Sequence, residues 1–310
     1  MSPLSGGRVQ RAVTALQQHP AVTFLLSALV VVSDLAAAFL SHGSLRRHLH
    51  LVLASLLLSG PALSMWVSKY SVFANRNHYL YRMFLNSGWG WTCVLCGSFV
   101  FLLSFSQRRS LALSLRHLSR LAAASAVWLG IRWLLTSLED ASGSCFEPLG
   151  MAISTCLEAV SPGQGSRLLL RDGESKTTCL RAGFQWRGAE VSQEAVLLCL
   201  CCLLLMEEIA VFGQCAPRNP GTPLRLLFLL CVALLGIWFF LLASLLAHFP
   251  QFPSQLIGGA LGCLAWRVLY LGWFSMEPSW CCPGGPASGL LSPAEEKGQA
   301  KNGNHRVHFS

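Results

Sequence analysis

The chain of 310 residues is 53% hydrophobic and 12% charged, and its mean hydropathy is +0.50. A soluble core of this length would not bury so much apolar side chain, so the composition excludes an ordinary water-soluble enzyme and indicates a polytopic membrane protein. The net charge of +9 does not indicate a nucleic-acid partner, because the basic residues lie in short loops beside apolar stretches and not along one soluble face.

Seven apolar stretches, centred near residues 30, 58, 97, 128, 203, 236 and 265, determine the architecture. Three of them contain no Asp, Glu, Lys or Arg, namely 49–68, 83–106 and 226–247. Each reaches the roughly 20 residues that cross a hydrocarbon core as a helix, and a buried soluble helix rarely needs an apolar run of that length. The sequence therefore predicts an all-α fold, a transmembrane helical bundle.

Charges interrupt the other four stretches. Asp34 lies within 21–41, Arg132 within 121–138, Glu207 and Glu208 within 195–213, and Arg267 within 256–276. Each stretch can still span if its charge faces protein or water. We expect six core spans from residue 49 onward and one extra apolar segment at 21–41, which is a further span, an interfacial helix or the apolar part of a signal peptide.

Loop charges orient the bundle. Four arginines bracket the turn between the third and fourth stretches, at 108, 109, 116 and 120, whereas the loop 139–194 holds eight acidic and five basic residues. The positive-inside rule places the turn in the cytosol and the loop in the lumen. A spanning segment at 21–41 conflicts with this orientation, because it would place the N-terminus with Arg8 and Arg11 in the lumen.

These observations divide the chain into three parts. Residues 1–48 form an N-terminal segment with the uncertain apolar helix 21–41, residues 49–276 form the membrane bundle with its lumenal loop, and residues 277–310 form a cytosolic tail. The tail is rich in Gly, Pro, Ser and Lys, so we expect it to be disordered.

The cysteines indicate one disulfide and no metal site. Cys145, Cys156 and Cys179 fall in the lumenal loop, where an oxidising compartment permits one bridge, and we favour Cys145 with Cys179. Cys199, Cys201 and Cys202 lie in an apolar stretch without His or carboxylate at ligand spacing on its N-terminal side. We interpret these three as buried small hydrophobes.

Glu207 and Glu208 are the sharpest polar feature within a span. Adjacent helix positions point about 100° apart, so one carboxylate can face a partner inside the bundle while the other reaches toward the interface. Arg132 is the candidate counter-ion, and a protonated glutamate is the alternative. An interfacial pair near the end of a short helix fits the same pattern.

A second pair lies at the lumenal helix ends. Glu194 begins the fifth span and His248 ends the sixth, and these helices are antiparallel neighbours, so both side chains lie at one membrane face. That placement suits acid and base chemistry on a lipid headgroup. The simpler interpretation is an acid favoured by a helix N-terminus and a single interfacial histidine.

The third feature is the sequence NSGWGWT at 86–92, where the chain enters the third span. Trp89 and Trp91 suit an aromatic belt, and Gly88 and Gly90 permit close helix approach. Asn86 is suited to hydrogen-bond an acylglycerol ester or hydroxyl, although belt anchoring alone also explains the pattern.

At these residues the chain resembles the fat storage-inducing transmembrane proteins of the endoplasmic reticulum. Six blocks match in order: NSGWGWT at 86–92, RHLSRL at 116–121, EDASGSCFEPL at 139–149, CLRAGFQWRG at 179–188, LLMEEIAVF at 204–212 and GCLAWRVLYLGWF at 262–274. Within the family, GSCFEPL and FQWRG are most similar to the type 1, muscle-type branch.

The resemblance implies a six-span bundle with cytosolic termini that binds diacylglycerol and triacylglycerol and promotes lipid droplet formation. A neutral glyceride has long acyl chains and a weakly polar head, so its site should be an apolar groove with a few hydrogen-bonding groups at the membrane edge. Asn86, Glu207 and Glu208 are the candidates. The chain has no P-loop, G-x-S-x-G or H-E-x-x-H motif, and we expect no cofactor.

The same resemblance supplies an enzymatic alternative. The type 2 branch resembles lipid phosphate phosphatases that cleave the diphosphate of acyl-coenzyme A with two histidines. Here Glu194 stands where the first histidine belongs, and His248 matches the second only with two residues inserted after it. A carboxylate would repel the diphosphate, so we rank hydrolysis below lipid binding. A transporter ranks last, because paired interrupted helices are missing from the pattern.

Overall fold

Long apolar helices dominate the computed structural model, which describes residues 20–67, 71–147, 169–171, 175–215, 220–276 and 283–290. Six helices in this part of the chain are long and apolar enough to cross a membrane. They are α2 (Pro20–Leu40), α5 (Gly88–Arg108), α6 (Leu111–Ser142), α9 (Gln193–Ala210), α11 (Thr222–His248) and α12 (Phe252–Trp266), the last continuing through η3 (Arg267–Gly272) and η4 (Trp273–Ser275). The predicted all-α polytopic membrane fold is confirmed.

The stretch 49–68 is not the uninterrupted span that its composition predicts. It forms α3 (Gly43–Leu58) and α4 (Gly60–Trp66), which are bent by 53° relative to each other. Pro61 lies in the first turn of α4, where its missing N–H is tolerated, and it could not continue α3. Because α3 begins at Gly43, the predicted boundary at residue 48 falls within a helix.

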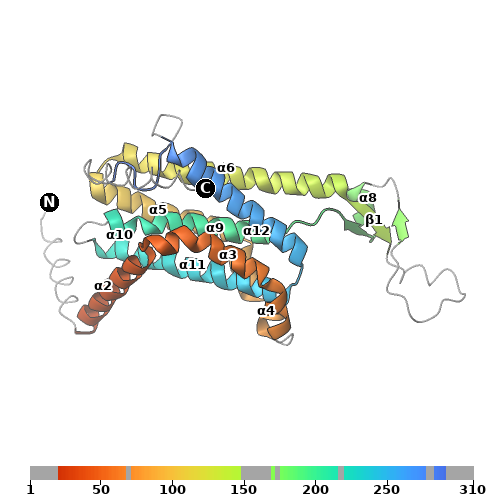
Figure 1. Ribbon diagram of the computed structural model, residues 1–310, viewed down its shortest axis with the longest axis horizontal. Coiled ribbons are helices and arrows are strands. Elements are labelled where there is room, and N and C mark those ends of the chain that lie inside the picture. Colours follow the sequence, from red (N-terminus) through yellow and green to blue (C-terminus); the bar gives the residue numbers. More distant parts are fainter. Residues whose placement is uncertain are drawn as a thin grey trace, which may run out of the picture.

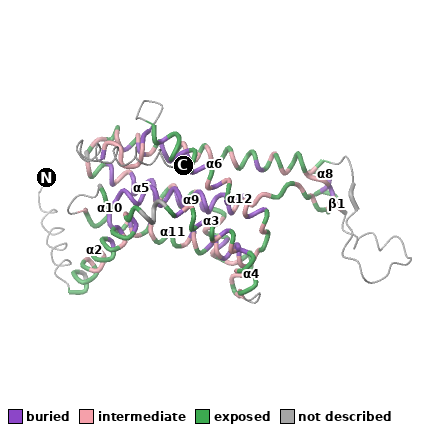
Figure 2. Tube along the Cα trace, viewed as in Figure 1, coloured by how far each residue is buried: buried purple, intermediate pink, exposed green. Residues whose placement is uncertain are grey.

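Helix α9 occupies the centre of the bundle (Figures 1 and 2). Every residue from Ala195 to Ala210 is buried, because α12, α11 and α5 pack around it. An α-helix that is apolar on all sides is stable only when it is enclosed in this way. The predicted burial of Cys199, Cys201 and Cys202 on this helix is confirmed.

Small residues bring α12 and α9 into backbone contact. A Cβ added at Gly258 would lie 2.5 Å from the Ser192 carbonyl oxygen, and one at Gly262 would lie 2.7 Å from that of Val196. This Gly-x-x-x-Gly spacing places two missing side chains on one helix face. On α5, Gly88 similarly approaches Leu197, whereas Gly90 faces open space.

Helix α6 extends beyond the bundle and carries a small cap (Figure 1). Its 32 residues reach about 48 Å, longer than the roughly 30 Å hydrocarbon core. The cap contains β1 (Ser144–Glu147), β2 (Leu169–Arg171), α8 (Lys176–Arg181) and β3 (Gln185–Arg187), with antiparallel strand order β2-β1-β3. A disulfide joins Cys145 to Cys179, the pair favoured from the sequence. We call the end of the bundle that carries this cap the disulfide end. The end with the α5–α6 turn is the opposite end.

Helix α2 contacts the bundle only near the opposite end, and Figure 1 shows it inclined away from the other helices. Arg225, near the start of α11, binds the Asp34 carboxylate and the Val30 carbonyl of α2. The C-terminal end of α2 packs on α10 (Phe212–Cys215). Segment 21–41 is therefore a helix attached to the bundle by the Arg225–Asp34 ion pair and by packing of its C-terminal end, where Ala37 and Leu40 are buried.

Part of the tail is ordered, contrary to the expectation of disorder from residue 277 onward. Residues 283–290 pack against α6, where Arg116 donates from Nε to the Pro283 carbonyl oxygen at 3.0 Å. Leu290 is buried in the apolar core. Composition predicted disorder because it does not register contacts that residues far away in the sequence supply.

We expect Gly262→Ala to lower the thermal unfolding midpoint in detergent, because the new Cβ would force α12 away from the Val196 carbonyl. Overpacking of this kind costs about 1–3 kcal/mol. Gly236→Ala on α11 is the matched control, since nothing lies within 4 Å of its added Cβ. An equal loss of stability in both variants would contradict the proposed close packing.

Candidate functional site

A polar pocket of about 510 Å³ lies at the disulfide end. The segment between α4 and α5, with η1 (Val72–Ala74) and η2 (Tyr81–Leu85), supplies most of its wall, and the start of α9 supplies the rest. The lining residues are Arg76, Asn77, Tyr81, Arg82, Leu85, Asn86 and Glu194. The pocket thus brings together two predicted site residues, Asn86 and Glu194.

Glu194 is held by an arginine that the sequence analysis did not consider. Arg76 donates from Nη2 to Glu194 Oε1 at 2.7 Å, and its guanidinium carbon lies 5.5 Å from the centroid of the Phe249 ring. The Arg76 side chain is 61% exposed and that of Glu194 29%, so the pair lies at the pocket mouth and contributes little stability. Its consequence is chemical, because the carboxylate already has a cationic partner.

Tyr81 forms the buried side of the pocket. Its hydroxyl donates to the Phe73 carbonyl oxygen at 3.0 Å, and its ring packs edge-on against Phe249 at 5.8 Å. Burial raises the pKa of the Tyr81 phenol, so the group remains a neutral donor at physiological pH. The pocket therefore has a neutral, partly aromatic inner wall and a charged mouth.

The NSGWGWT segment connects the pocket to the bundle. Trp89 stacks on Trp128 of α6 with ring centroids 6.1 Å apart and donates to Ser125 Oγ at 3.1 Å. Trp91 donates to the Met83 carbonyl oxygen at 3.3 Å. These contacts fix the start of α5, and they leave Asn86 exposed on the pocket wall.

His248 lies at the same end but is not among the described residues that line the pocket. It is the last residue of α11, and its neighbour Phe249 packs against Tyr81 and Arg76. The structure therefore places Glu194 with Asn86 and not in a shared pocket with His248.

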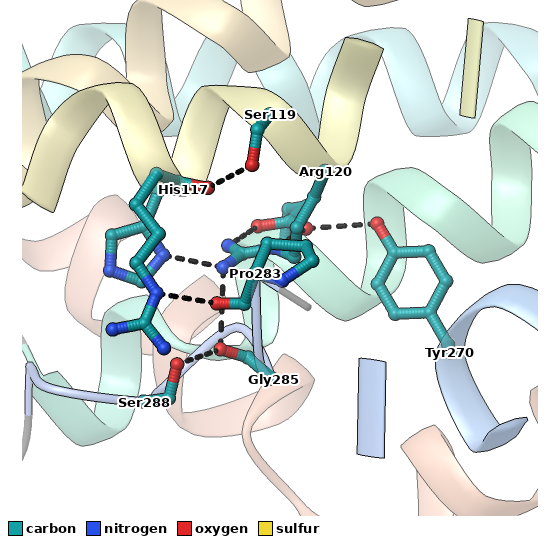
Figure 3. Close-up of polar contacts among 9 residues, drawn as sticks. His117, Ser119, Arg120, Tyr270, Pro283, Gly285 and Ser288 are labelled. Carbon is teal, nitrogen blue, oxygen red and sulfur yellow. Dashed lines mark hydrogen bonds and ion pairs between the residues drawn. The ribbon is translucent and has the colours of Figure 1, made fainter. Parts of the chain in front are cut away.

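A second polar cluster lies inside the membrane bundle (Figure 3). Arg120 of α6 donates from Nη2 to Glu208 Oε2 at 2.7 Å and from Nε to Oε1 at 3.0 Å. Tyr270 of η3 donates to the same Oε1 at 2.8 Å. The Arg120 and Glu208 side chains are 1% and 2% exposed, so this is a fully buried, bidentate ion pair.

The predicted counter-ion, Arg132, was wrong. Arg132 is exposed on α6, whereas Arg120 lies about three turns earlier and faces α9. The RHLSRL block held the signal, because His117 and Arg120 are three positions apart and share a helix face. Arg116 and Arg120 were predicted only to orient the bundle, and no role was predicted for His117 or Tyr270.

Both predicted acids of α9 are buried, with Glu207 7% and Glu208 3% exposed. Both carboxylate oxygens of Glu208 accept from Arg120, and one also accepts from Tyr270, so this residue has a structural role. Lipid binding by Glu207 remains a prediction.

Comparison with known proteins agrees with the resemblance. The profile described as "FIT: Fat storage-inducing transmembrane protein" matches residues 69–223. A zebrafish (Danio rerio) fat storage-inducing transmembrane protein 1 is 62% identical over 271 residues, which cover 87% of this chain and 93% of that protein. This chain belongs to the fat storage-inducing transmembrane protein family.

The other family members fall into two groups, which differ in their names and in their similarity to this chain. Human fat storage-inducing transmembrane protein 1 is 39% identical over 93% of this chain and 92% of its own length. Mouse acyl-coenzyme A diphosphatase FITM2 is 27% identical over 76% of this chain and 86% of its own length. The chain is therefore more similar to these type 1 relatives. No solved structure matches it.

The family profile covers both polar sites described above. Its range of 69–223 includes every residue that lines the pocket and both members of the buried ion pair. Tyr270 and His248 lie outside it.

We expect Glu208→Gln to destabilise this family member strongly, because the Arg120 guanidinium would stay buried without a counter-charge. Breaking a buried pair costs about 3–5 kcal/mol. Glu139→Gln is the matched control, since its carboxylate contacts Lys176 at 3.4 Å near the surface and should contribute under about 1 kcal/mol. Thermal unfolding in detergent measures both, and similar small losses would show that the pair is not structural.

Proposed function

We propose that this protein binds diacylglycerol and triacylglycerol in the endoplasmic reticulum membrane and thereby promotes lipid droplet formation and fat storage. The observation that carries the proposal is the pocket at the disulfide end. Asn86 lines it at the entrance to a membrane-spanning helix, its one described carboxylate is paired with Arg76, and no histidine is among its described lining residues.

The chemistry of the pocket suits a weakly polar head. Glyceride ester carbonyls accept hydrogen bonds, and the Asn86 amide can donate one while also accepting from the free hydroxyl of diacylglycerol. Leu85 adds apolar surface to the same wall. A site with few polar groups beside an apolar surface is typical of small-molecule binding.

An exposed apolar face of α5 begins close to this pocket in the sequence, two residues after Asn86. Trp91, Val94 and Phe105 of α5 are exposed, and their spacing places them along one face of the helix. An apolar helix face that no protein covers is solvated by lipid tails. We place the acyl chains of the bound glyceride along this face.

The disulfide supports the proposed location in the endoplasmic reticulum membrane. Cys145 and Cys179 are bridged in the cap beyond α6, and disulfides persist in oxidising spaces such as the lumen of the endoplasmic reticulum. The arginine-rich α5–α6 turn lies at the opposite end, as the positive-inside rule requires for the cytosol. Both observations support a lumenal position for the pocket.

One observation favours the enzymatic alternative, an acyl-coenzyme A diphosphatase. Arg76 and Arg82 both line the pocket, and guanidinium groups suit phosphate recognition. Glu194, at the position of the first family histidine, opposes that activity because its negative charge lies in the same pocket. A single imidazole at His248 would have to perform two roles, so we rank this function second.

We expect Asn86→Ala to weaken diacylglycerol binding by about tenfold, because a hydrogen bond to an ester is worth about 1.4 kcal/mol when its partner is left unpaired. Purified protein and a fluorescent diacylglycerol provide the measurement. Gln193→Ala is the matched control, since this amide lies at the same membrane edge but does not line the pocket. Equal affinities in the two variants would contradict a site at Asn86.

Phosphate release from acyl-coenzyme A, measured on the same sample, tests the alternative. We expect the protein with its natural sequence to release no phosphate above background. Glu194→His restores the imidazole at the family position, and we expect it to raise phosphate release if His248 is competent. Rapid release by the unaltered protein that disappears in His248→Ala would support the enzyme and contradict our ranking.

A further inference from the structure

Four buried polar side-chain atoms in the described part of the chain have no hydrogen-bond partner, and two of them are donors on adjacent residues near the opposite end. The two donors are Nη2 of Arg116 and Nε2 of His117, neighbours near the start of α6. Buried polar groups in proteins nearly always have a hydrogen-bond partner, so an unpaired donor calls for an explanation such as an ion or ligand. These two donors belong neither to the pocket nor to the Arg120–Glu208 contacts themselves.

The neighbouring ion pair determines which nitrogen of His117 donates. Nδ1 of His117 contacts Nη1 of Arg120, and a guanidinium can only donate, so Nδ1 must be the acceptor. The proton of the neutral ring is therefore on Nε2. His117 is 2% exposed, so this N–H is directed into the protein interior without a partner.

The charge of Arg116 has no counter-ion among the described residues. Arg120 has its counter-ion in Glu208, but no ion pair in the described chain includes Arg116. Its Nε donates to the neutral carbonyl of Pro283 at 3.0 Å. Arg116 as a whole is half-buried, but its Nη2 is shielded from water, and a guanidinium nitrogen shielded in this way favours a negatively charged ligand.

The segment 283–290 folds over these donors (Figure 3). Gly284 has φ 77°, and a Cβ there would lie 3.4 Å from Nη2 of Arg116 and 2.8 Å from Oγ of Ser288. The backbone thus passes close to the unpaired end of Arg116, and a glycine permits this conformation. Ser288 donates to the Gly285 carbonyl oxygen at 2.8 Å and fixes the turn.

We propose that Arg116, His117 and the turn 283–290 form a binding site for a phosphate group. Arg116 is five residues from the start of α6, about 8 Å along its axis, so the site lies near the end of a helix that is long enough to span the membrane. The phosphate is the headgroup of an anionic lipid such as phosphatidic acid or a free phosphate ion, and both present the same acceptor oxygens.

The test uses the purified full-length protein in detergent, titrated separately with short-chain phosphatidic acid, short-chain phosphatidylcholine and inorganic phosphate. We expect saturable stabilisation by phosphatidic acid that Arg116→Gln weakens at least about tenfold, the range for a charge-assisted hydrogen bond. Arg109→Gln is the matched control, because it removes the same charge from an exposed position in the same turn. Arg116→Lys should retain most of the affinity, since lysine binds phosphate as a point charge.

His117→Gln supplies a second variant in case Arg116→Gln fails to fold, and the unfolding midpoint without ligand identifies that failure. We expect His117→Gln to lower the affinity for the phosphate group less than Arg116→Gln. Inorganic phosphate binding with the same dependence on Arg116 would assign the site to the free ion. Equal losses in Arg109→Gln and Arg116→Gln, or no saturable binding of either phosphate species, would overturn the proposal.

Discussion

The buried ion pair between Arg120 and Glu208 fixes how α6, α9 and η3 meet inside the membrane. Two full charges in a low-dielectric interior are tolerated only when each compensates the other, and the bidentate geometry with Tyr270 satisfies both carboxylate oxygens. The pair therefore sets the position of the central helix along the bundle. Because α9 is a rigid rod, fixing one end also places Glu194 at the other end, in the pocket.

The proposed lipid site is separate from this buried ion pair. Glu208 is engaged by protein groups, and the close Gly258 and Gly262 contacts seal α9 against α12. In the proposed function, recognition of an uncharged fat falls to Asn86, which precedes α5 and its exposed apolar face. The two ends of the bundle carry different chemistry, with unpaired donors at the opposite end and the polar pocket at the disulfide end.

The sequence predicted the features that follow from burial in lipid, such as the apolar helices. It did not predict the features that depend on which face of a helix a side chain occupies. Long apolar runs must become helices in lipid, so most spans were predicted, and the cysteine pair favoured in the loop 139–194, Cys145 with Cys179, is the disulfide of the structure. The break at Pro61 was missed because hydropathy alone does not register a helix start. Arg132 was predicted as the counter-ion in place of the observed Arg120, because the sequence gives the position of a residue along a helix but not which helix face meets α9. The Arg76 contact with Glu194 joins residues 118 positions apart, beyond any local pattern.

The central claim is that Glu208 organises the bundle and does not itself bind lipid. Replacing both partners, with Arg120→Met and Glu208→Leu together, removes the charges while preserving volume, a change that buried ion pairs often tolerate. Diacylglycerol binding by this double variant, measured on folded protein, is the most direct test. The account predicts an affinity close to that of the natural sequence. A folded double variant that no longer binds diacylglycerol would contradict it and would make Glu208 a lipid ligand.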